Sequence, residues 1–145
     1  MKKKYLSNSF NQTRKIGRQL AEEALKAKKA FVVGLTGELG GGKTTFLQGF
    51  ARGLGVKEKI LSPTFVIIKR FRLDTKQFGN LYHIDCYRIQ KPEELLDLGF
   101  KKIISNPQNI VVVEWANRIR KIMPKKAIWI NFKFVDGKTR KITLE

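Results

Sequence analysis

Two uninterrupted hydrophobic runs stand out along the chain, FVVGL at 31–35 and IVVV at 110–113. Each has the length and the β-branched content of a strand that is buried on both faces. Such strands occupy the centre of parallel sheets, where helices cover both sides. The pattern therefore predicts two central, parallel strands in an α/β fold.

Hydrophobic residues at helical spacing lie on either side of the first run. Ser9 and Gln12 have the spacing of a capping box, and an apolar stripe continues from them to about residue 28. A second stripe follows Lys43 and stops at Gly55, a residue type that often terminates helices. We therefore expect one helix before the first buried strand and one directly after it.

Two pairs of segments have the composition of antiparallel strands. Segments 64–73 and 81–88 are separated by a short polar turn, which predicts that they pair directly. Segments 127–134 and 138–144 flank Asp136-Gly137, a strong hairpin signal, and we expect this hairpin at an edge of the sheet. The prediction is one domain over residues 1–145 with a mixed parallel and antiparallel sheet.

A full P-loop pattern, Gly37-x-x-x-x-Gly42-Lys43-Thr44, lies between the first buried strand and its helix. Glycines let the backbone N–H groups approach phosphate oxygens, and the helix N-terminus faces the anion. Lys43 would reach the β- and γ-phosphates, and the Thr44 hydroxyl would join the Mg²⁺ shell. The alternative is a glycine-rich turn before an ordinary helix, but the strand–loop–helix context favours a P-loop NTPase-like three-layer fold.

Two acidic residues follow the predicted strands where a nucleotide-bound magnesium ion would need them. Asp85 lies late in one strand and Glu114 directly follows IVVV, and ligands of open α/β sheets bind beyond the carboxyl ends of strands. Each is a candidate magnesium ligand or a residue that positions the attacking water. The structural alternatives are a solvent-facing edge residue for Asp85 and a salt bridge for Glu114.

Several other side chains are candidates for contact with the nucleotide. Phe10 and Thr13 could touch the base, although a hydrophobic staple and a helix-surface threonine are the favoured structural alternatives. Trp115 could stack on the base or on a partner, with a half-buried core tryptophan as the alternative. His83 is the only histidine, which excludes a histidine-based metal cluster and favours a packed polar residue.

The composition adds a strong positive charge to this picture. The chain has 30 Lys and Arg against 12 Asp and Glu, which gives a net charge of +18. Such a charge favours a polyanionic partner such as RNA, DNA or an acidic protein surface, unless the charge is spread evenly.

Cys86 is the only cysteine in the sequence, so we expect a reducing, cytoplasmic location. No apolar run is long enough for a membrane span.

The segments GELGGGKTT, SPTF, HIDCYR followed by PEEL, and VEW resemble, in order and spacing, the TsaE family (formerly YjeE) over nearly the whole chain. That family is the P-loop ATPase component of bacterial threonylcarbamoyladenosine tRNA modification. The resemblance implies a magnesium-associated Thr44, a magnesium or hydrolysis role for Asp85, and a functional Glu114-Trp115 pair. It implies that the phosphate loop consists of Leu39, Gly40, Gly41, Gly42, Lys43, Thr44 and Thr45. Gly41 and Glu38 depart mildly from the family pattern.

The resemblance also implies ATP and Mg²⁺ as cofactors and the TsaD and TsaB proteins as partners. Hydrolysis by the isolated chain should be slow, because the sequence places no arginine finger. A small-molecule P-loop kinase and a basic RNA-binding module that contacts tRNA are the alternatives. At 145 residues the kinase has little room for an acceptor pocket and a lid.

Overall fold

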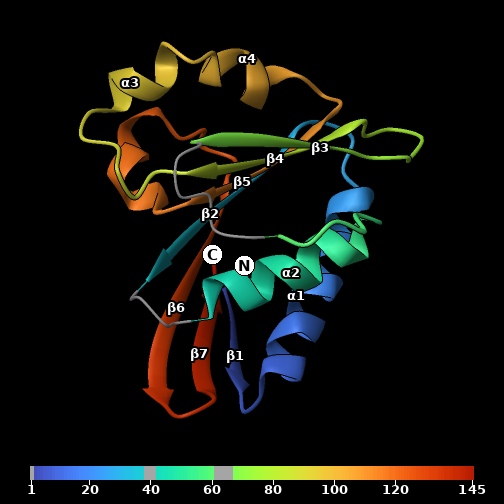
Figure 1. Ribbon diagram of the computed structural model, residues 1–145, viewed down its shortest axis with the longest axis vertical. Helices are drawn as coiled ribbons and strands as arrows, with labels where there is room; N and C mark the ends of the chain where they lie inside the picture. Colours follow the sequence, from blue (N-terminus) through green and yellow to red (C-terminus); the bar gives the residue numbers. More distant parts are fainter. Residues whose placement is uncertain (1, 38–41, 61–66) are drawn as a thin grey trace.

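A seven-stranded mixed sheet forms the centre of the molecule in the computed structural model, which describes residues 2–37, 42–60 and 67–145 (Figure 1). The strand order is β1-β7-β6-β2-β5-β4-β3. The strands are β1 (Lys3–Ser7), β2 (Phe31–Gly37), β3 (Ile68–Arg72), β4 (Asn80–Asp85), β5 (Asn109–Glu114), β6 (Ile128–Asp136) and β7 (Thr139–Leu144).

Helices cover both faces of this sheet. They are α1 (Phe10–Leu25), α2 (Lys43–Gly53), α3 (Pro92–Leu96), α4 (Phe100–Ser105) and the 3₁₀ helix η1 (Ala116–Ile122). Helices α1 and α2 pack together on one face, and α3, α4 and η1 lie over the other (Figure 1). This arrangement confirms the three-layer α/β fold. Within the described ranges, no helix is long and apolar enough to cross a membrane.

The parallel centre of the sheet follows the prediction. Strand β2 is the middle strand and pairs in parallel with both β5 and β6, and β4 pairs in parallel with β5. All six residues of β5 are buried, as expected for a strand covered on both faces. Strands β3 and β4 pair antiparallel, which confirms the predicted pairing of these two segments.

The predicted edge position of the final hairpin is wrong. Strand β6 lies against β2, and β7 is covered by β1, which forms the edge of the sheet. The sequence analysis missed β1 because it is short and carries Lys3 and Lys4, and its pairing with β7 depends on a distant segment. Helix α1 ends at Leu25 rather than near residue 28.

Ser9 begins α1 in the predicted manner. Its side-chain oxygen accepts a hydrogen bond from the Gln12 backbone N–H at 3.1 Å. The Gln12 side chain accepts in turn from the backbone N–H of Asn8 at 2.6 Å. The first bond satisfies a donor of the first helical turn, whereas the second is made by the residue before the cap rather than by the Ser9 N–H that a capping box would use.

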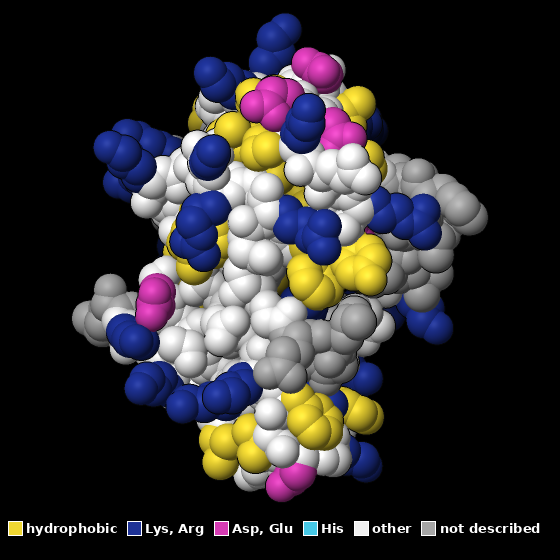
Figure 2. Space-filling model, turned by 90° about the vertical axis from the view of Figure 1, so that its left-hand side faces the viewer, with side chains coloured by type: hydrophobic (Ala, Val, Ile, Leu, Met, Phe, Trp, Pro, Cys, Tyr) yellow, Lys and Arg dark blue, Asp and Glu magenta, His cyan; other side chains and the backbone are white. Residues whose placement is uncertain are grey.

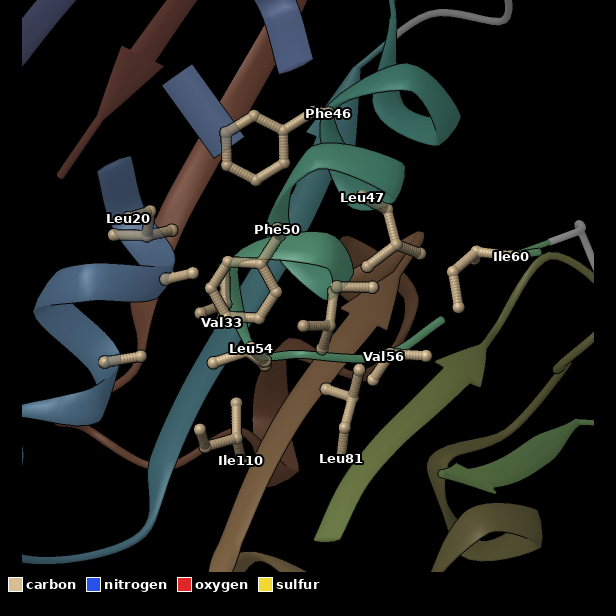
Figure 3. Close-up of a cluster of buried hydrophobic side chains, with 14 of the residues drawn as sticks. Leu20, Val33, Phe46, Leu47, Phe50, Leu54, Val56, Ile60, Leu81 and Ile110 are labelled. Atoms are coloured by element: carbon tan, nitrogen blue, oxygen red, sulfur yellow. The ribbon is translucent and has the colours of Figure 1, made fainter. Parts of the chain in front are cut away.

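The core between the α1–α2 pair and the sheet is formed by aliphatic and aromatic side chains (Figure 3). Phe46 and Phe50 of α2 are fully buried in the same cluster as the sheet residues Val33 and Ile110, and the Phe46 ring packs edge-on against Phe132 of β6. The two helices are also in unusually close contact, because a side chain at Gly49 would collide with the backbone of Arg14. These contacts fix the position of α2, whose N-terminus faces the candidate site.

Candidate active site

The carboxyl ends of three parallel strands meet beside the N-terminus of α2. In the register of the sheet, Glu114 of β5 lies between Leu35 of β2 and Asp85 of β4. His83 and Asp85 are two residues apart on β4, so their side chains point to the same face of the sheet. The predicted acids are therefore neighbours at the edge of the sheet where α/β proteins bind ligands.

The N-terminus of α2 is free of competing side chains within the described residues. Its N-cap is Gly42, with φ +98°, and no side chain caps the helix or places an acid in its first turn. An eleven-residue helix with open N–H groups attracts an anion. Thr44 and Thr45 lie in this first turn and are half-buried.

Lys43 extends from this turn into the site. It is buried, and its Nζ donates to the Gly37 carbonyl oxygen at 2.8 Å. The same ammonium lies 4.0 Å from the centre of the Trp115 ring, in a cation–π contact. Burial lowers the pKa of Lys43, while the charges of Glu114 and Asp85 raise it. The lysine therefore lies within the field of both predicted acids.

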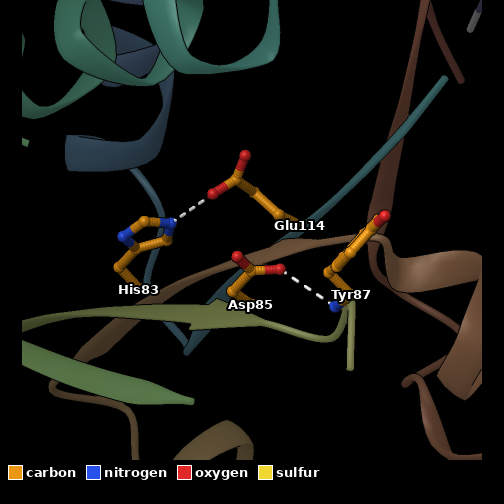
Figure 4. A network of polar contacts seen from close by, with 4 residues as sticks. All are labelled: His83, Asp85, Tyr87 and Glu114. Carbon is orange, nitrogen blue, oxygen red and sulfur yellow. Dashed lines mark hydrogen bonds and ion pairs between the residues drawn. The ribbon is translucent and has the colours of Figure 1, made fainter. Parts of the chain in front are cut away.

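Glu114 is held by a side chain that the sequence analysis did not assign to the site. The Nε2 of His83 lies 2.6 Å from a Glu114 carboxylate oxygen, and the two residues are 1% and 4% exposed (Figure 4). An ionised carboxylate accepts and cannot donate, so the imidazole N–H is the donor in this pair. The spacing of His83 and Asp85 on one strand was the available signal, but the link to Glu114 depends on sheet register.

Asp85 is less enclosed than Glu114. One of its carboxylate oxygens accepts a hydrogen bond from the Tyr87 backbone N–H at 3.0 Å (Figure 4). Burial raises the pKa of Asp85, and the Glu114 charge adds to the rise, while the Tyr87 hydrogen bond, His83 and Lys43 lower it. The two neighbouring carboxylates repel each other, and a bound cation would reduce this repulsion.

Trp115 closes one side of this cluster. It is the only non-glycine residue with positive φ, at 57°, among those that the structure describes. A left-handed conformation is costly for a bulky residue, and such outliers persist where surrounding contacts enforce them. Here the ring packs edge-on against Tyr87, with centroids 5.1 Å apart, and Arg118 lies 5.7 Å from its centre.

The two residues predicted near the base are placed differently from each other. Thr13 is buried beside Gly42, with its methyl carbon 3.8 Å from where a Cβ on that glycine would stand. Its hydroxyl lies 2.7 Å from the Ser7 Oγ. Phe10 is 43% exposed, and the Nζ of Lys138 is 5.8 Å from its ring centre. Thr13 therefore lies beside the start of α2, and Phe10 beside the β6–β7 turn.

Arg140 is a further residue at this position that the sequence analysis did not single out. It is buried, and its Cγ lies 3.4 Å from the position of a Cβ on Gly42. Its guanidinium donates to the Gly137 carbonyl oxygen at 2.7 Å. The β6–β7 turn is thereby fixed next to the start of α2, a relation that only the pairing of distant strands creates.

Some predicted residues lie outside the described ranges. They are Leu39, Gly40 and Gly41 of the phosphate loop and residues 62–64 of the SPTF segment, which resembles a switch-like loop of the TsaE family. Among the described residues, no group of three or more His, Cys, Asp or Glu side chains could hold a metal ion. Asp85 and Glu114, which are neighbours in the register of the sheet, supply carboxylate oxygens, the ligand type that Mg²⁺ commonly binds together with substrate phosphates and water.

Comparisons with known proteins agree with this architecture. A family described as "Threonylcarbamoyl adenosine biosynthesis protein TsaE" matches residues 7–142. The tRNA threonylcarbamoyladenosine biosynthesis protein TsaE of Haemophilus influenzae is 34% identical over 134 residues, covering 91% of this chain and 82% of that protein. The Bacillus subtilis protein of the same name is 40% identical over 117 residues, covering 81% and 70%.

A solved structure extends the likeness to three dimensions. The crystal structure of Bacillus subtilis YdiB superposes with a TM-score of 0.72 at 32% sequence identity, covering 99% of this chain and 84% of that one. Both the sequence and the fold thus match over nearly the full length of the chain. The chain belongs to the TsaE family.

Proposed function

We propose that this protein is a Mg²⁺-dependent ATPase that acts in the threonylcarbamoyladenosine modification of tRNA. Its family membership and the names of its relatives support the tRNA pathway. The observation that carries the ATPase proposal is the meeting of Lys43, at the open N-terminus of α2, with Asp85 and Glu114. A cation, helix N–H groups and two carboxylates are the parts that phosphoryl transfer requires.

Each side chain has a distinct proposed role. The α2 N–H groups and Lys43 would bind the β- and γ-phosphates, and Thr44, Asp85 and Glu114 would hold the metal. Bound Mg²⁺ would neutralise charge on the phosphate oxygens. Asp85 or Glu114 orients the attacking water. His83 is a positioning residue, because its hydrogen bond fixes the Glu114 carboxylate.

The remaining loop and aromatic residues would complete nucleotide binding. Leu39, Gly40, Gly41 and Thr45 belong to the phosphate loop that the family resemblance implies. We assign the base and ribose to the side of the site near Thr13 and Phe10, with Trp115 as the alternative stacking partner. Thr13 supports this assignment because it lies against Gly42.

The proposed partners are the TsaB and TsaD proteins. ATP hydrolysis would reset their complex between rounds of tRNA modification rather than transfer the threonylcarbamoyl group. We expect slow hydrolysis by the isolated chain and faster hydrolysis in the complex, because a partner can supply a missing transition-state contact.

The test measures phosphate release by the chain alone and with TsaB–TsaD, together with tRNA modification in the same reaction. Lys43→Ala, Asp85→Ala and Glu114→Ala should each lower hydrolysis by about 100-fold or more. The exposed residues Asp97 and Lys101 provide matched controls, and their alanine variants should retain activity. Full activity in all three site variants would refute the site. Transfer of the phosphoryl group to a metabolite instead of water would identify a kinase.

A further inference from the structure

A cationic hollow lies on the sheet, and none of Lys43, Asp85 and Glu114 lines it. It encloses about 490 Å³ and is lined by residues of β1, β7, β6, β2 and η1. Helices α3 and α4 cover the other half of the sheet, around β4 and β5 (Figure 1). Figure 2 shows a shallow pale hollow on this side of the molecule, bordered by Lys and Arg side chains.

Four cationic side chains line the hollow against one acidic side chain. Lys2, Lys4, Arg120 and Lys141 all contribute, and Glu145 is the single acid. The Glu145 carboxylate lies 3.1 Å from Lys2, and both side chains are exposed. Within the described residues, Lys4 and Lys141 form no ion pair with a carboxylate. When charges of one sign line a concave surface and are not neutralised nearby, the electrostatic potential inside the hollow is strengthened.

The floor of the hollow is polar and contains one flat cationic surface. Thr36 and Asn131 lie in it, joined by a 3.0 Å hydrogen bond between their side chains, beside Thr143. Arg120 stacks over Trp129, with its guanidinium carbon 4.1 Å from the ring centre. A stacked guanidinium keeps its N–H edge for phosphate oxygens and offers a plane on which a base can stack.

We propose that this hollow binds the phosphate backbone of RNA. An acidic protein partner is less well matched, because the buried centre of a protein interface is usually rich in aromatic and aliphatic residues. Among the described residues of the lining, Trp129 alone is of this type, and Arg120 covers it. RNA complements most of the lining: phosphates would meet the cations, 2′-hydroxyls would meet the threonine and asparagine groups, and a base would meet the Arg–Trp stack. This binding is separate from the proposed ATP hydrolysis.

The experiment measures binding of an unmodified tRNA transcript by fluorescence anisotropy across a series of KCl concentrations, without ATP. The variant Lys4→Gln/Lys141→Gln removes two charges from the hollow, and Lys101→Gln/Lys102→Gln removes two from α4. We expect the first pair to weaken binding about tenfold and to reduce the slope of log K against log salt by about 1.5. The second pair should change affinity less than about twofold.

Two outcomes would overturn the proposal. Equal weakening by both double variants would mean that RNA binds through diffuse charge. Binding of poly-glutamate as tightly as tRNA, with the same loss in Lys4→Gln/Lys141→Gln, would identify an acidic protein surface as the partner. Arg120→Gln should reduce binding more than Arg120→Lys, since lysine keeps the charge but loses the stacked plane. Lys43→Ala should bind RNA normally, which separates this result from the ATPase test.

Discussion

Replacing His83 by alanine should destabilise the protein by leaving the Glu114 carboxylate buried without its hydrogen-bond donor. Both side chains are almost completely inaccessible to water, and their polar atoms are 2.6 Å apart. Leaving a buried hydrogen-bonding group without its partner costs about 1–3 kcal/mol, and more when that group is charged. We expect a loss of about 3 kcal/mol, because the group left without a donor is a carboxylate, although the Lys43 ammonium still attracts it.

Urea denaturation at neutral pH, followed by circular dichroism, would measure this loss. His83→Gln is the matched variant, because the amide retains an N–H donor and should recover part of the stability. The double variant His83→Ala/Glu114→Ala should lose about 2 kcal/mol less free energy of unfolding than the sum of the losses in the two single variants. A His83→Ala protein within about 1 kcal/mol of the parent would refute the reasoning.

Three further substitutions test other parts of the structure. Asp85→Asn should raise stability in urea at pH 7 while it abolishes ATP turnover. Because the pKa of Asp85 is raised in the folded state, the parent loses stability as pH rises from 3.8 to that raised pKa, and the difference between parent and variant should disappear below pH 3.8. Gly49→Ala should lower the free energy of unfolding by about 2–3 kcal/mol through collision with α1, as thermal denaturation would report. At Gly79 a Cβ would meet only the Gln108 side-chain oxygen at 4.0 Å, so Gly79→Ala should change the free energy of unfolding by less than about 1 kcal/mol. Ser9→Ala should cost about 1 kcal/mol in the same assay, and no change would exclude its capping role.

Local patterns predicted the elements whose burial is nearly complete. The runs at 31–35 and 110–113 are hydrophobic along their whole length, so β2 and β5 were recognisable without knowledge of their partners. The motif residues Lys43, Asp85 and Glu114 were likewise found from their positions relative to strands and a helix. Their proximity agrees with the rule that parallel strands present their carboxyl ends at one edge.

Features that depend on pairing between distant segments were not predictable in this way. Strand β1 carries lysines and gains its stability from β7, which follows more than a hundred residues later. The His83–Glu114 contact requires the register of β4 against β5, and the Arg140–Gly42 approach requires the β6–β7 hairpin to lie beside β2. The periodicity of a sequence predicts which side of a strand is buried, but it does not predict which other strand pairs with it.

The close contact between α1 and α2 also has a mechanical consequence. Gly17 and Gly49 leave no gap between the two helices, so neither helix can slide without the other. If an anion bound at the N-terminus of α2 displaced this helix, α1 would move with it. A partner that contacts only the outer side of α1 would then respond to anion binding at α2 without touching the anion.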